Sequence, residues 1–210
     1  MFVKICGITR AEDAEVAVAL GARAIGFIFW PSSPRFIEQE RAREIASRLP
    51  ASVMTVGVFV NQPVEHVSDV ASRVGLSSVQ LHGDETPAYA RLLSTPVIRA
   101  TTLDHGALAD WPADTTILLD AHDPVRRGGT GHTIDWSAAA HVAVTRRVLL
   151  SGGLTPENVA EAVARVRPFG IDVSSGVEVS PGVKDHMRLR ALFDALRTAE
   201  RESLRSSARE

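Results

Sequence analysis

The chain has 210 residues, of which 45% are hydrophobic and 23% charged, and its formal net charge is −2. Intrinsic disorder is excluded, because a disordered chain has few apolar residues and a large net charge. A nucleic-acid partner bound through bulk positive charge is excluded as well, since the phosphate backbone requires a basic surface. No apolar run approaches the roughly 18 residues of a transmembrane helix, so no membrane partner is expected.

A single cysteine excludes an intrachain disulfide, and with it a secreted scaffold built on disulfides. The first residues reach a charge at Lys4 and another at Arg10, with no apolar stretch and cleavage site of the kind that directs secretion. The sequence therefore predicts a cytoplasmic protein.

Short apolar runs alternate with amphipathic segments along the chain. Strands are predicted, in chain order, over residues 2–6, 24–29, 53–60, 78–81, 96–100, 116–120, 147–151 and 170–174. Each is followed by a predicted helix, over residues 11–20, 38–49, 64–74, 85–93, 103–110, 135–143, 156–166 and 187–200, the fifth having the weakest pattern.

Regular alternation of this kind requires parallel strands joined by helical crossovers, and eight units can close on themselves. We predict a single (β/α)8 TIM barrel over residues 1–200, with the active site at the C-terminal ends of the strands. An open doubly wound sheet is the alternative fold. Residues 201–210 are polar and are predicted to form a disordered tail.

Four strands carry polar side chains on one face. Residues alternate between the two faces of a strand, and the apolar set must meet the helices, so the other set points into the barrel. Its polar members are Lys4, Cys6, Gln80, His82, Asp120, Asp172 and Ser174. Most lie at strand C-terminal ends, where barrel enzymes build active sites. A purely structural, hydrogen-bonded role stays an open alternative, above all for Lys4, Gln80 and Asp172.

Three glycine-rich segments, residues 126–133, 151–158 and 174–185, follow the sixth, seventh and eighth predicted strands. Backbone N–H groups reach an anion only where no Cβ blocks the approach, and the loops after strands seven and eight are the usual phosphate site of this barrel. We therefore predict that residues 151–153 and 174–176 bind a phosphate, with tight-turn glycines as the alternative. No Gly-Lys-Ser/Thr follows the GGTG segment, so ATP is not implied.

Arg35 lies in the segment PSSPRF, directly after the second predicted strand. Pro31 and Pro34 stiffen this loop, which suits a guanidinium held ready to bind a carboxylate through two hydrogen bonds. A solvated surface arginine is the alternative interpretation.

In combination these segments resemble a known family. The motifs KICGIT, SPR, VQLHGDE and LLD, followed by GGTG…DW, LSGGLTPENV and DVSSGVE…PGVKD, are similar to those of phosphoribosylanthranilate isomerase. The match runs from Val3 to about Asp185. The family acts in tryptophan biosynthesis, and the resemblance implies an aldose–ketose isomerase, which is an intramolecular oxidoreductase. Its reaction converts N-(5-phosphoribosyl)anthranilate to the 1-deoxyribulose phosphate by an Amadori rearrangement.

The resemblance also implies roles for individual residues. Cys6 corresponds to the general base and Asp120 to the general acid, while Arg35 would pair with the anthranilate carboxylate. The substrate phosphate would be held at Gly153, Ser175 and Gly176, with Gly129 as a further substrate-binding residue and His82 lining the site without an assigned role. A small phosphorylated substrate is the implied partner, no metal or organic cofactor is needed, and the chain is expected to be a monomer or a homodimer.

Two expectations about the site accompany the resemblance. Cys6 must be available as a thiolate, so its pKa is expected to be lowered, with Lys4 on the same face as the stabilising cation. Asp120 must arrive protonated. One residue departs from the family pattern: His132 stands where GGTGKT has a lysine, which would make any assistance to phosphate binding depend on protonation.

Two alternative functions remain open from the sequence. One is a related isomerase acting on an aminoaldose of histidine biosynthesis, or a bifunctional form, although such enzymes use two aspartates and Cys6 stands in place of the first. The other is a non-catalytic phosphate-binding barrel, which the presence of both Cys6 and Asp120 disfavours.

Overall fold

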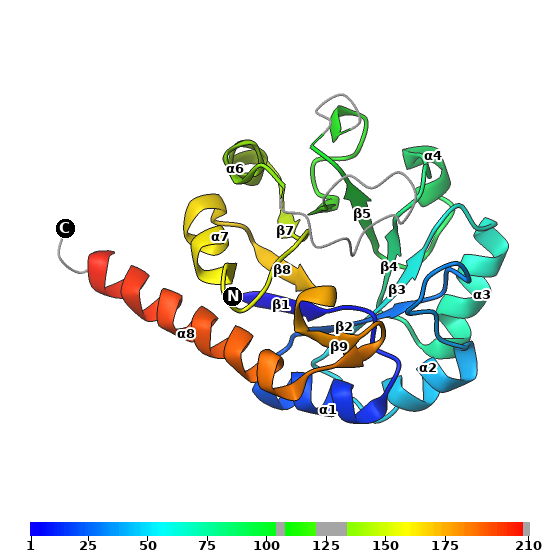
Figure 1. The fold of residues 1–210 in the computed structure, drawn as a ribbon. Helices are drawn as coiled ribbons and strands as arrows, with labels where there is room; N and C mark the ends of the chain where they lie inside the picture. The colour runs from blue at the N-terminus through cyan, green and yellow to red at the C-terminus, as the bar shows by residue number, and fades with distance from the viewer. Residues whose placement is uncertain (104–107, 121–133, 208–210) are drawn as a thin grey trace.

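The computed structural model describes residues 1–103, 108–120 and 134–207, and it is a closed barrel of eight parallel strands surrounded by helices (Figure 1). Neighbouring strands pair in chain order, and β8 pairs with β1 to close the sheet. The strands are β1 (Phe2–Ile5), β2 (Ala24–Ile28), β3 (Met54–Phe59), β4 (Ser78–Leu81), β5 (Val97–Thr101), β6 (Thr116–Leu119), β7 (Val148–Leu150) and β8 (Gly170–Val173). The predicted TIM barrel is confirmed, and the open sheet is excluded.

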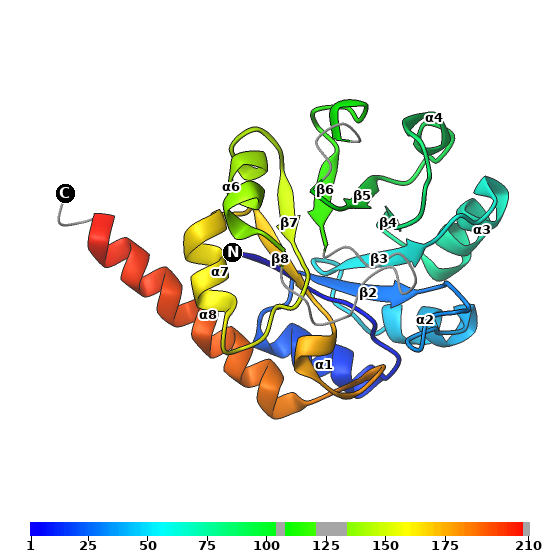
Figure 2. The same ribbon diagram turned by 45° about the horizontal axis from the view of Figure 1, so that its top comes forward.

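Helices cover the outside of the barrel, as the turned view shows (Figure 2). They are α1 (Ala11–Leu20), α2 (Gln39–Ala46), α3 (Val64–Val74), α4 (Pro87–Ala90), α6 (Trp136–Thr145), α7 (Val159–Val166) and α8 (His186–Ser207). Residues 104–107 of the fifth predicted helix lie outside the described residues. Among the described helices, none is long and apolar enough to cross a membrane.

Local sequence explains where several helices begin and end. Helices α1 and α3 stop at Gly21 and Gly75, whose φ angles of 117° and 75° suit a residue without a Cβ. Helix α6 begins after Asp135, whose carboxylate accepts hydrogen bonds from the free backbone N–H groups of Ser137 and Ala138.

Two segments differ from the sequence predictions. Helix α8 continues to Ser207, so the prediction of a disordered tail is not met over residues 201–207; Arg, Glu and Leu are good helix formers, and polarity alone does not end a helix. The segment after β8 was predicted as a loop, but it forms a short 3-10 helix, η1 (Ser175–Val177), and an antiparallel hairpin of β9 (Glu178–Ser180) and β10 (Val183–Lys184). These strands are too short to give an alternating pattern.

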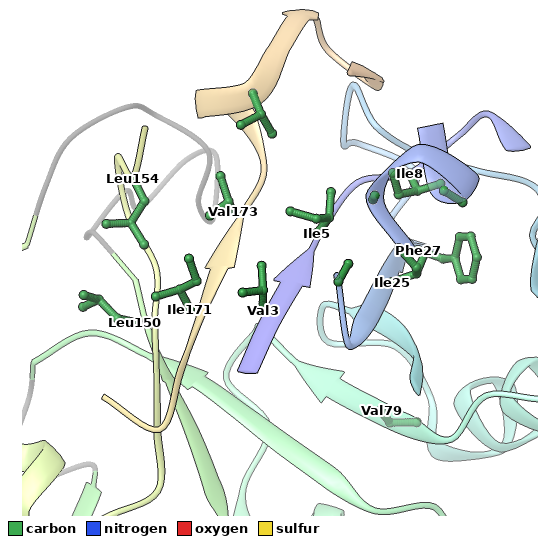
Figure 3. Close-up of a cluster of buried hydrophobic side chains, with 14 of the residues drawn as sticks. Val3, Ile5, Ile8, Ile25, Phe27, Val79, Leu150, Leu154, Ile171 and Val173 are labelled. Carbon is green, nitrogen blue, oxygen red and sulfur yellow. The ribbon is translucent and has the colours of Figure 1, made fainter. Parts of the chain in front are cut away.

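The apolar core has an outer and an inner part. The outward-facing strand residues pack against the helices in one large cluster, in which Val3, Ile5 and Val173 are each at most 3% exposed (Figure 3). A second, smaller cluster fills the barrel interior and contains Ala24, Val56, Ile98, Ala100, Leu118 and Leu149. The predicted assignment of strand faces is confirmed, because the apolar set meets the helices.

A polar network shares the interior with this inner cluster. The fully buried ammonium of Lys4 donates hydrogen bonds to Asp172 Oδ1 at 2.8 Å and to Gln80 Oε1 at 2.9 Å. Strand pairing places Lys4 beside Asp172, since these two residues are partners in the β1–β8 register. The contacts therefore agree with the structural alternative, in which Lys4, Gln80 and Asp172 are hydrogen-bonded groups of the barrel interior.

The closing seam between β1 and β8 depends on a residue without a side chain. A Cβ added to Gly170 would lie 2.4 Å from the carbonyl oxygen of Phe2, and this backbone atom cannot move without disturbing the seam. We expect Gly170→Ala to lower the free energy of unfolding by about 1–3 kcal/mol or more, the usual cost of overpacking, measured by urea denaturation.

Gly75→Asn is the matched control for this substitution. Nothing lies within 4 Å of a Cβ at Gly75, and asparagine tolerates a left-handed backbone. We expect this variant to stay within about 0.5 kcal/mol of the wild type, as most surface substitutions do. Equal stability of the Gly170→Ala variant and the wild type would contradict the tight seam.

Candidate active site

A pocket of about 740 Å³ opens at the carboxyl ends of the barrel strands. Its wall is formed by residues at the ends of β1, β2, β3, β4, β6, β7 and β8 or directly after these strands. The predicted site residues that line it are Cys6, Arg35, His82, Asp120, Gly153, Ser175 and Gly176. The structure thus brings together in one pocket all of the predicted site residues that it describes. Gly129 and His132 lie outside the described residues.

Cys6 is the first residue after β1, and its backbone N–H donates to the carbonyl of Val173 at 2.9 Å. Its side chain has room because β2 carries a glycine on the inward face. A Cβ on Gly26 would lie 2.8 Å from Cys6 Sγ and 3.1 Å from Lys4 Cε. Gly26 therefore leaves space for the Cys6 side chain. The sequence prediction missed this residue because Gly26 lies within an apolar run.

Burial raises the pKa of the Cys6 thiol, and this effect outweighs the nearby Lys4 ammonium, which acts in the opposite direction. The Asp172 carboxylate also raises this pKa. The predicted lowering of the Cys6 pKa is therefore wrong, because the sequence shows the cation but not the depth of burial. Lys4 itself has a raised pKa: burial works to lower it, but Asp172 and Cys6 favour the charged form.

Asp120 directly follows β6, and its backbone N–H donates to the carbonyl of Thr101 at 3.0 Å. Its carboxylate oxygen Oδ2 lies 3.6 Å from Nε2 of His82, which follows β4. The other ring nitrogen of His82, Nδ1, lies 3.0 Å from Nε2 of Gln80. Cys6 and Asp120 thus enter the pocket from two strands that are not neighbours in the barrel.

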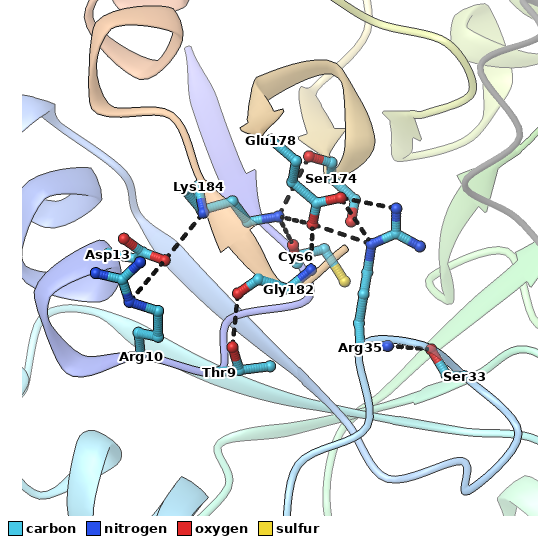
Figure 4. A network of polar contacts seen from close by, with 10 residues as sticks. All are labelled: Cys6, Thr9, Arg10, Asp13, Ser33, Arg35, Ser174, Glu178, Gly182 and Lys184. Carbon is cyan, nitrogen blue, oxygen red and sulfur yellow. Dashed lines mark hydrogen bonds and ion pairs between the residues drawn. The ribbon is translucent and has the colours of Figure 1, made fainter. Parts of the chain in front are cut away.

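Arg35 is held by an acidic partner that sequence reasoning did not identify. Its Nε lies 3.0 Å from both carboxylate oxygens of Glu178, and its Nη2 donates to Oε2 at 2.8 Å (Figure 4). The side chain of Arg35 is only 11% exposed, so the alternative of a solvated arginine is excluded. Among the described residues, its Nη1 has no hydrogen-bond acceptor, so that side of the fork can still take a ligand carboxylate.

Lys184 of β10 fixes this ion pair to the rest of the site. Its ammonium donates to Glu178 Oε1 at 2.7 Å, to the carbonyl of Cys6 at 2.6 Å and to that of Ser174 at 3.2 Å (Figure 4). Burial would raise the pKa of Glu178, but the Arg35 hydrogen bond and the Lys184 charge hold it below its ordinary value. Burial lowers the pKa of Lys184, with Glu178 opposing the effect. The only sequence signal for this lysine was its place in PGVKD.

The glycine loops after β7 and β8 touch each other at the edge of the pocket. Gly152 and Gly153 have φ angles of 84° and 61°, and a Cβ on Gly176 would lie 1.9 Å from the carbonyl oxygen of Leu154. The side chain of Asn158 fixes the first loop, since it donates to the carbonyl of Gly153 at 2.9 Å. The glycines therefore have a structural reason of their own, and they also leave backbone N–H groups open to an anion.

No group of three or more His, Cys, Asp or Glu side chains that could hold a metal ion occurs among the described residues. The pocket is surrounded by a carboxyl group, a thiol, a guanidinium and two glycine loops.

A family model described as N-(5'-phosphoribosyl)anthranilate (PRA) isomerase matches residues 3–195. The chain belongs to this family. The N-(5'-phosphoribosyl)anthranilate isomerase of Citrifermentans bemidjiense is 48% identical over 195 residues, which are 91% of this chain and 94% of that protein. The enzyme of the same name from Trichlorobacter lovleyi is 49% identical over 193 residues, 90% of this chain and 94% of the relative.

Solved structures agree with this membership. The phosphoribosyl anthranilate isomerase of Thermus thermophilus superposes with a TM-score of 0.87 at 45% identity, covering 94% of this chain and 99% of that one. A second isomerase structure, in complex with reduced 1-(o-carboxyphenylamino)-1-deoxyribulose 5-phosphate, has a TM-score of 0.84 at 43% identity with the same coverage. The resemblance seen in the motifs is therefore confirmed across nearly the whole isomerase barrel.

The raised pKa of Cys6 has a measurable consequence in the free isomerase. Only the thiolate reacts with iodoacetamide, so we expect the alkylation rate of the folded protein to rise with pH along a curve whose midpoint lies above that of the urea-unfolded chain. Mass spectrometry follows the reaction at this single cysteine, and Cys6→Ser gives the background. A midpoint below that of the unfolded chain would show that the Lys4 charge, not burial, dominates.

Proposed function

We propose that Cys6 is the general base and Asp120 the general acid of this isomerase. The enzyme performs the phosphoribosylanthranilate isomerase reaction, an aldose–ketose isomerisation of tryptophan biosynthesis. The observation that carries the assignment is their placement: one titratable group follows β1, the other follows β6, and both line one pocket with Arg35 and the glycine loops.

The chemistry needs one proton delivered and one removed. Asp120 gives its proton to the furanose oxygen, the ring C–O bond at C1 breaks, and the nitrogen lone pair forms a Schiff base with C1. The Cys6 thiolate then takes the proton from C2. The electrons of the C2–H bond form the C1=C2 double bond of the enolamine as the C1=N electrons return to nitrogen, and the enolamine tautomerises to the ketone. C1 is reduced as C2 is oxidised, so the redox change stays within the substrate and no external oxidant is required.

The raised pKa of Cys6 is compatible with a base in this reaction. The C2 proton becomes acidic only once the Schiff base has formed, because the iminium group accepts the electrons. Lys4 lies beside the thiol and favours the thiolate, as its effect on the Cys6 pKa shows. The base therefore acts on an activated intermediate, with the fixed Lys4 charge stabilising its anionic form.

Three further contacts would hold the substrate. Arg35 can take the anthranilate carboxylate through the side of its fork that Glu178 leaves open. Gly153, Ser175 and Gly176 offer backbone N–H groups for the phosphate, in the loops where this barrel usually binds one. Trp30 and the nearby apolar residues Val58 and Val60 line the same pocket and suit the aromatic ring. Binding energy from these distant groups positions the reacting bonds.

The relatives reported above give no support to the histidine-pathway isomerase, the bifunctional form or a non-catalytic barrel. A structure of the Thermotoga maritima isomerase is described as monomers generated from a dimeric enzyme, which is consistent with a monomer or a homodimer here. The oligomeric state and the cytoplasmic location stay predictions, as does residue 200 as the end of the barrel domain.

We expect Cys6→Ser and Asp120→Asn each to lower kcat by about 10²–10⁴, with KM changed only a fewfold. Serine keeps the shape of cysteine but is too weak an acid to supply an anionic base near neutral pH. Asparagine keeps the shape of Asp120 but has no carboxylic proton to give. The assay follows the loss of anthranilate fluorescence, and full activity in either variant would remove that residue from its role.

We expect Arg35→Ala to raise KM roughly tenfold to a hundredfold, with a smaller effect on kcat, because a lost charge-assisted hydrogen bond costs about 1.5–3 kcal/mol. Arg35→Lys keeps the charge without the planar fork and should fall between the two. Arg73→Ala removes an exposed arginine that bridges Asp69 on α3, and serves as the matched control with an unchanged KM. An unchanged KM in Arg35→Ala would separate Arg35 from the substrate carboxylate.

A further inference from the structure

A chain of polar contacts crosses the barrel interior and ends at Asp120. It begins at Asp172 on β8, which accepts from Lys4 on β1 at 2.8 Å, and Lys4 donates in turn to Gln80 Oε1 on β4 at 2.9 Å. Gln80 Nε2 then lies 3.0 Å from His82 Nδ1, and His82 Nε2 lies 3.6 Å from Asp120 Oδ2. The side chains of Lys4 and His82 are 0% and 15% exposed, so bulk water competes little for these contacts.

The chemistry of each group fixes which atom donates and which accepts along this chain. An ammonium can only donate, so the atom of Gln80 that faces Lys4 must be its carbonyl oxygen. The amide nitrogen of Gln80 therefore faces His82, and it too can only donate. Nδ1 of His82 must accept, which leaves the ring proton on Nε2, the nitrogen that faces Asp120. A proton on Nδ1 would point at the Gln80 NH2 group, with both sides donating.

We propose that Gln80 holds His82 as the neutral Nε2–H tautomer, so that His82 is an uncharged hydrogen-bond donor to Asp120. This inference rests on the proposed role of Asp120 as the general acid. A cationic imidazolium beside Asp120 would favour its ionised form, and an ionised carboxylate has no proton to deliver. A neutral donor leaves Asp120 able to carry its proton and still stabilises the carboxylate that forms when the proton leaves.

This arrangement makes His82 and Gln80 positioning residues. Besides His82 itself, the charged or titratable side chains among the described residues that line the same pocket are Cys6, Arg35, Asp120 and Asp172. Of these, Asp120 is the one that pairs with His82, while Asp172 is reached only through Lys4 and Gln80. The buried Lys4 charge thus sets the tautomer two bonds away, without touching the acid itself.

The first experiment reads the tautomer directly. Long-range ¹H–¹⁵N spectra of ¹⁵N-histidine-labelled enzyme, with the His82→Gln variant used to assign the signal, should show His82 with its proton on Nε2 and a bare Nδ1. Gln80→Glu replaces the side-chain amide with a carboxylate of nearly the same shape. The variant keeps an oxygen that accepts from Lys4, but it presents an acceptor in place of the NH2 donor to Nδ1 of His82. We expect Nδ1 of His82 to become protonated in that variant. We expect kcat to fall roughly tenfold to a hundredfold, which is part of the rate enhancement that a positioned general acid contributes, and KM to change less.

A matched pair of substitutions tests the donor itself. The side-chain amide of His82→Gln can reach the place of Nε2 and keep an N–H towards Asp120, whereas the shorter amide of His82→Asn lies at the place of Nδ1. We expect His82→Gln to retain roughly tenfold more kcat than His82→Asn, within the range attributed to acid catalysis. Circular dichroism and thermal unfolding of both variants ensure that the comparison is between folded enzymes.

The outcomes separate this proposal from the assignment of Asp120. A wild-type His82 with its proton on Nδ1 overturns the proposal, and so does a Gln80→Glu variant with an unchanged tautomer or an unchanged kcat. Equal activity of the two His82 variants overturns the role of His82 as a donor. If the tautomer is as proposed but Asp120→Asn keeps full activity, it is the acid assignment that fails, and the chain of polar contacts stands without it.

Discussion

A lysine ammonium buried in a barrel interior must be paired, and the active site of this isomerase is arranged around that requirement. Lys4 is fully buried and donates to Asp172 and Gln80, while Gly26 leaves the space that its side chain needs. An unpaired charge at this depth would cost several kcal/mol, whereas a paired one has a defined position. The same cation lies beside the Cys6 thiol on one side and orients Gln80 on the other.

The hairpin after β8 contains a second buried and paired lysine, at the edge of the pocket. Lys184 binds the carbonyls of Cys6 and Ser174 and the carboxylate of Glu178, which in turn holds the guanidinium of Arg35. One buried cation therefore links the residue after β1, the residue after β8 and the arginine from the loop after β2. Arg35 is pre-oriented by Glu178 rather than by its flanking prolines alone, which reduces the side-chain entropy lost when a carboxylate binds.

The barrel could be predicted from sequence because its rules are periodic. Strand alternation places Val3 and Ile5 outward and Lys4 inward. The structure has this alternation in each strand whose inward face carries polar residues. The contents of the pocket could be predicted for a related reason, since inward residues at strand ends must converge. What could not be predicted was contact between segments: Glu178 is 143 residues from Arg35, and no local pattern pairs them.

The error over Cys6 has the same origin. The sequence shows that Lys4 shares a face with Cys6, which argues for a lowered thiol pKa, but it does not show that both side chains lie in a region where desolvation is the larger effect. Coulomb attraction and desolvation grow together as water is removed, so only the packed geometry decides which one prevails. Gly26 is part of that geometry, because the space it leaves is what allows thiol and ammonium to approach.

The interior polar network connects two sides of the pocket, since Lys4 lies beside Cys6 and is linked through Gln80 to His82. Burial raises the pKa of the Cys6 thiol, and the Lys4 ammonium opposes this effect by favouring the thiolate that a general base requires. Lys4 serves both ends, as a charge for the future thiolate and, through Gln80, as the group that orients His82. In the proposed binding mode, the two anionic groups of the substrate lie at Arg35 and at the glycine loops. Negative charge close to the thiol favours its neutral form, so the Lys4 ammonium is the charge that keeps a thiolate accessible when a doubly anionic substrate is bound at the proposed positions.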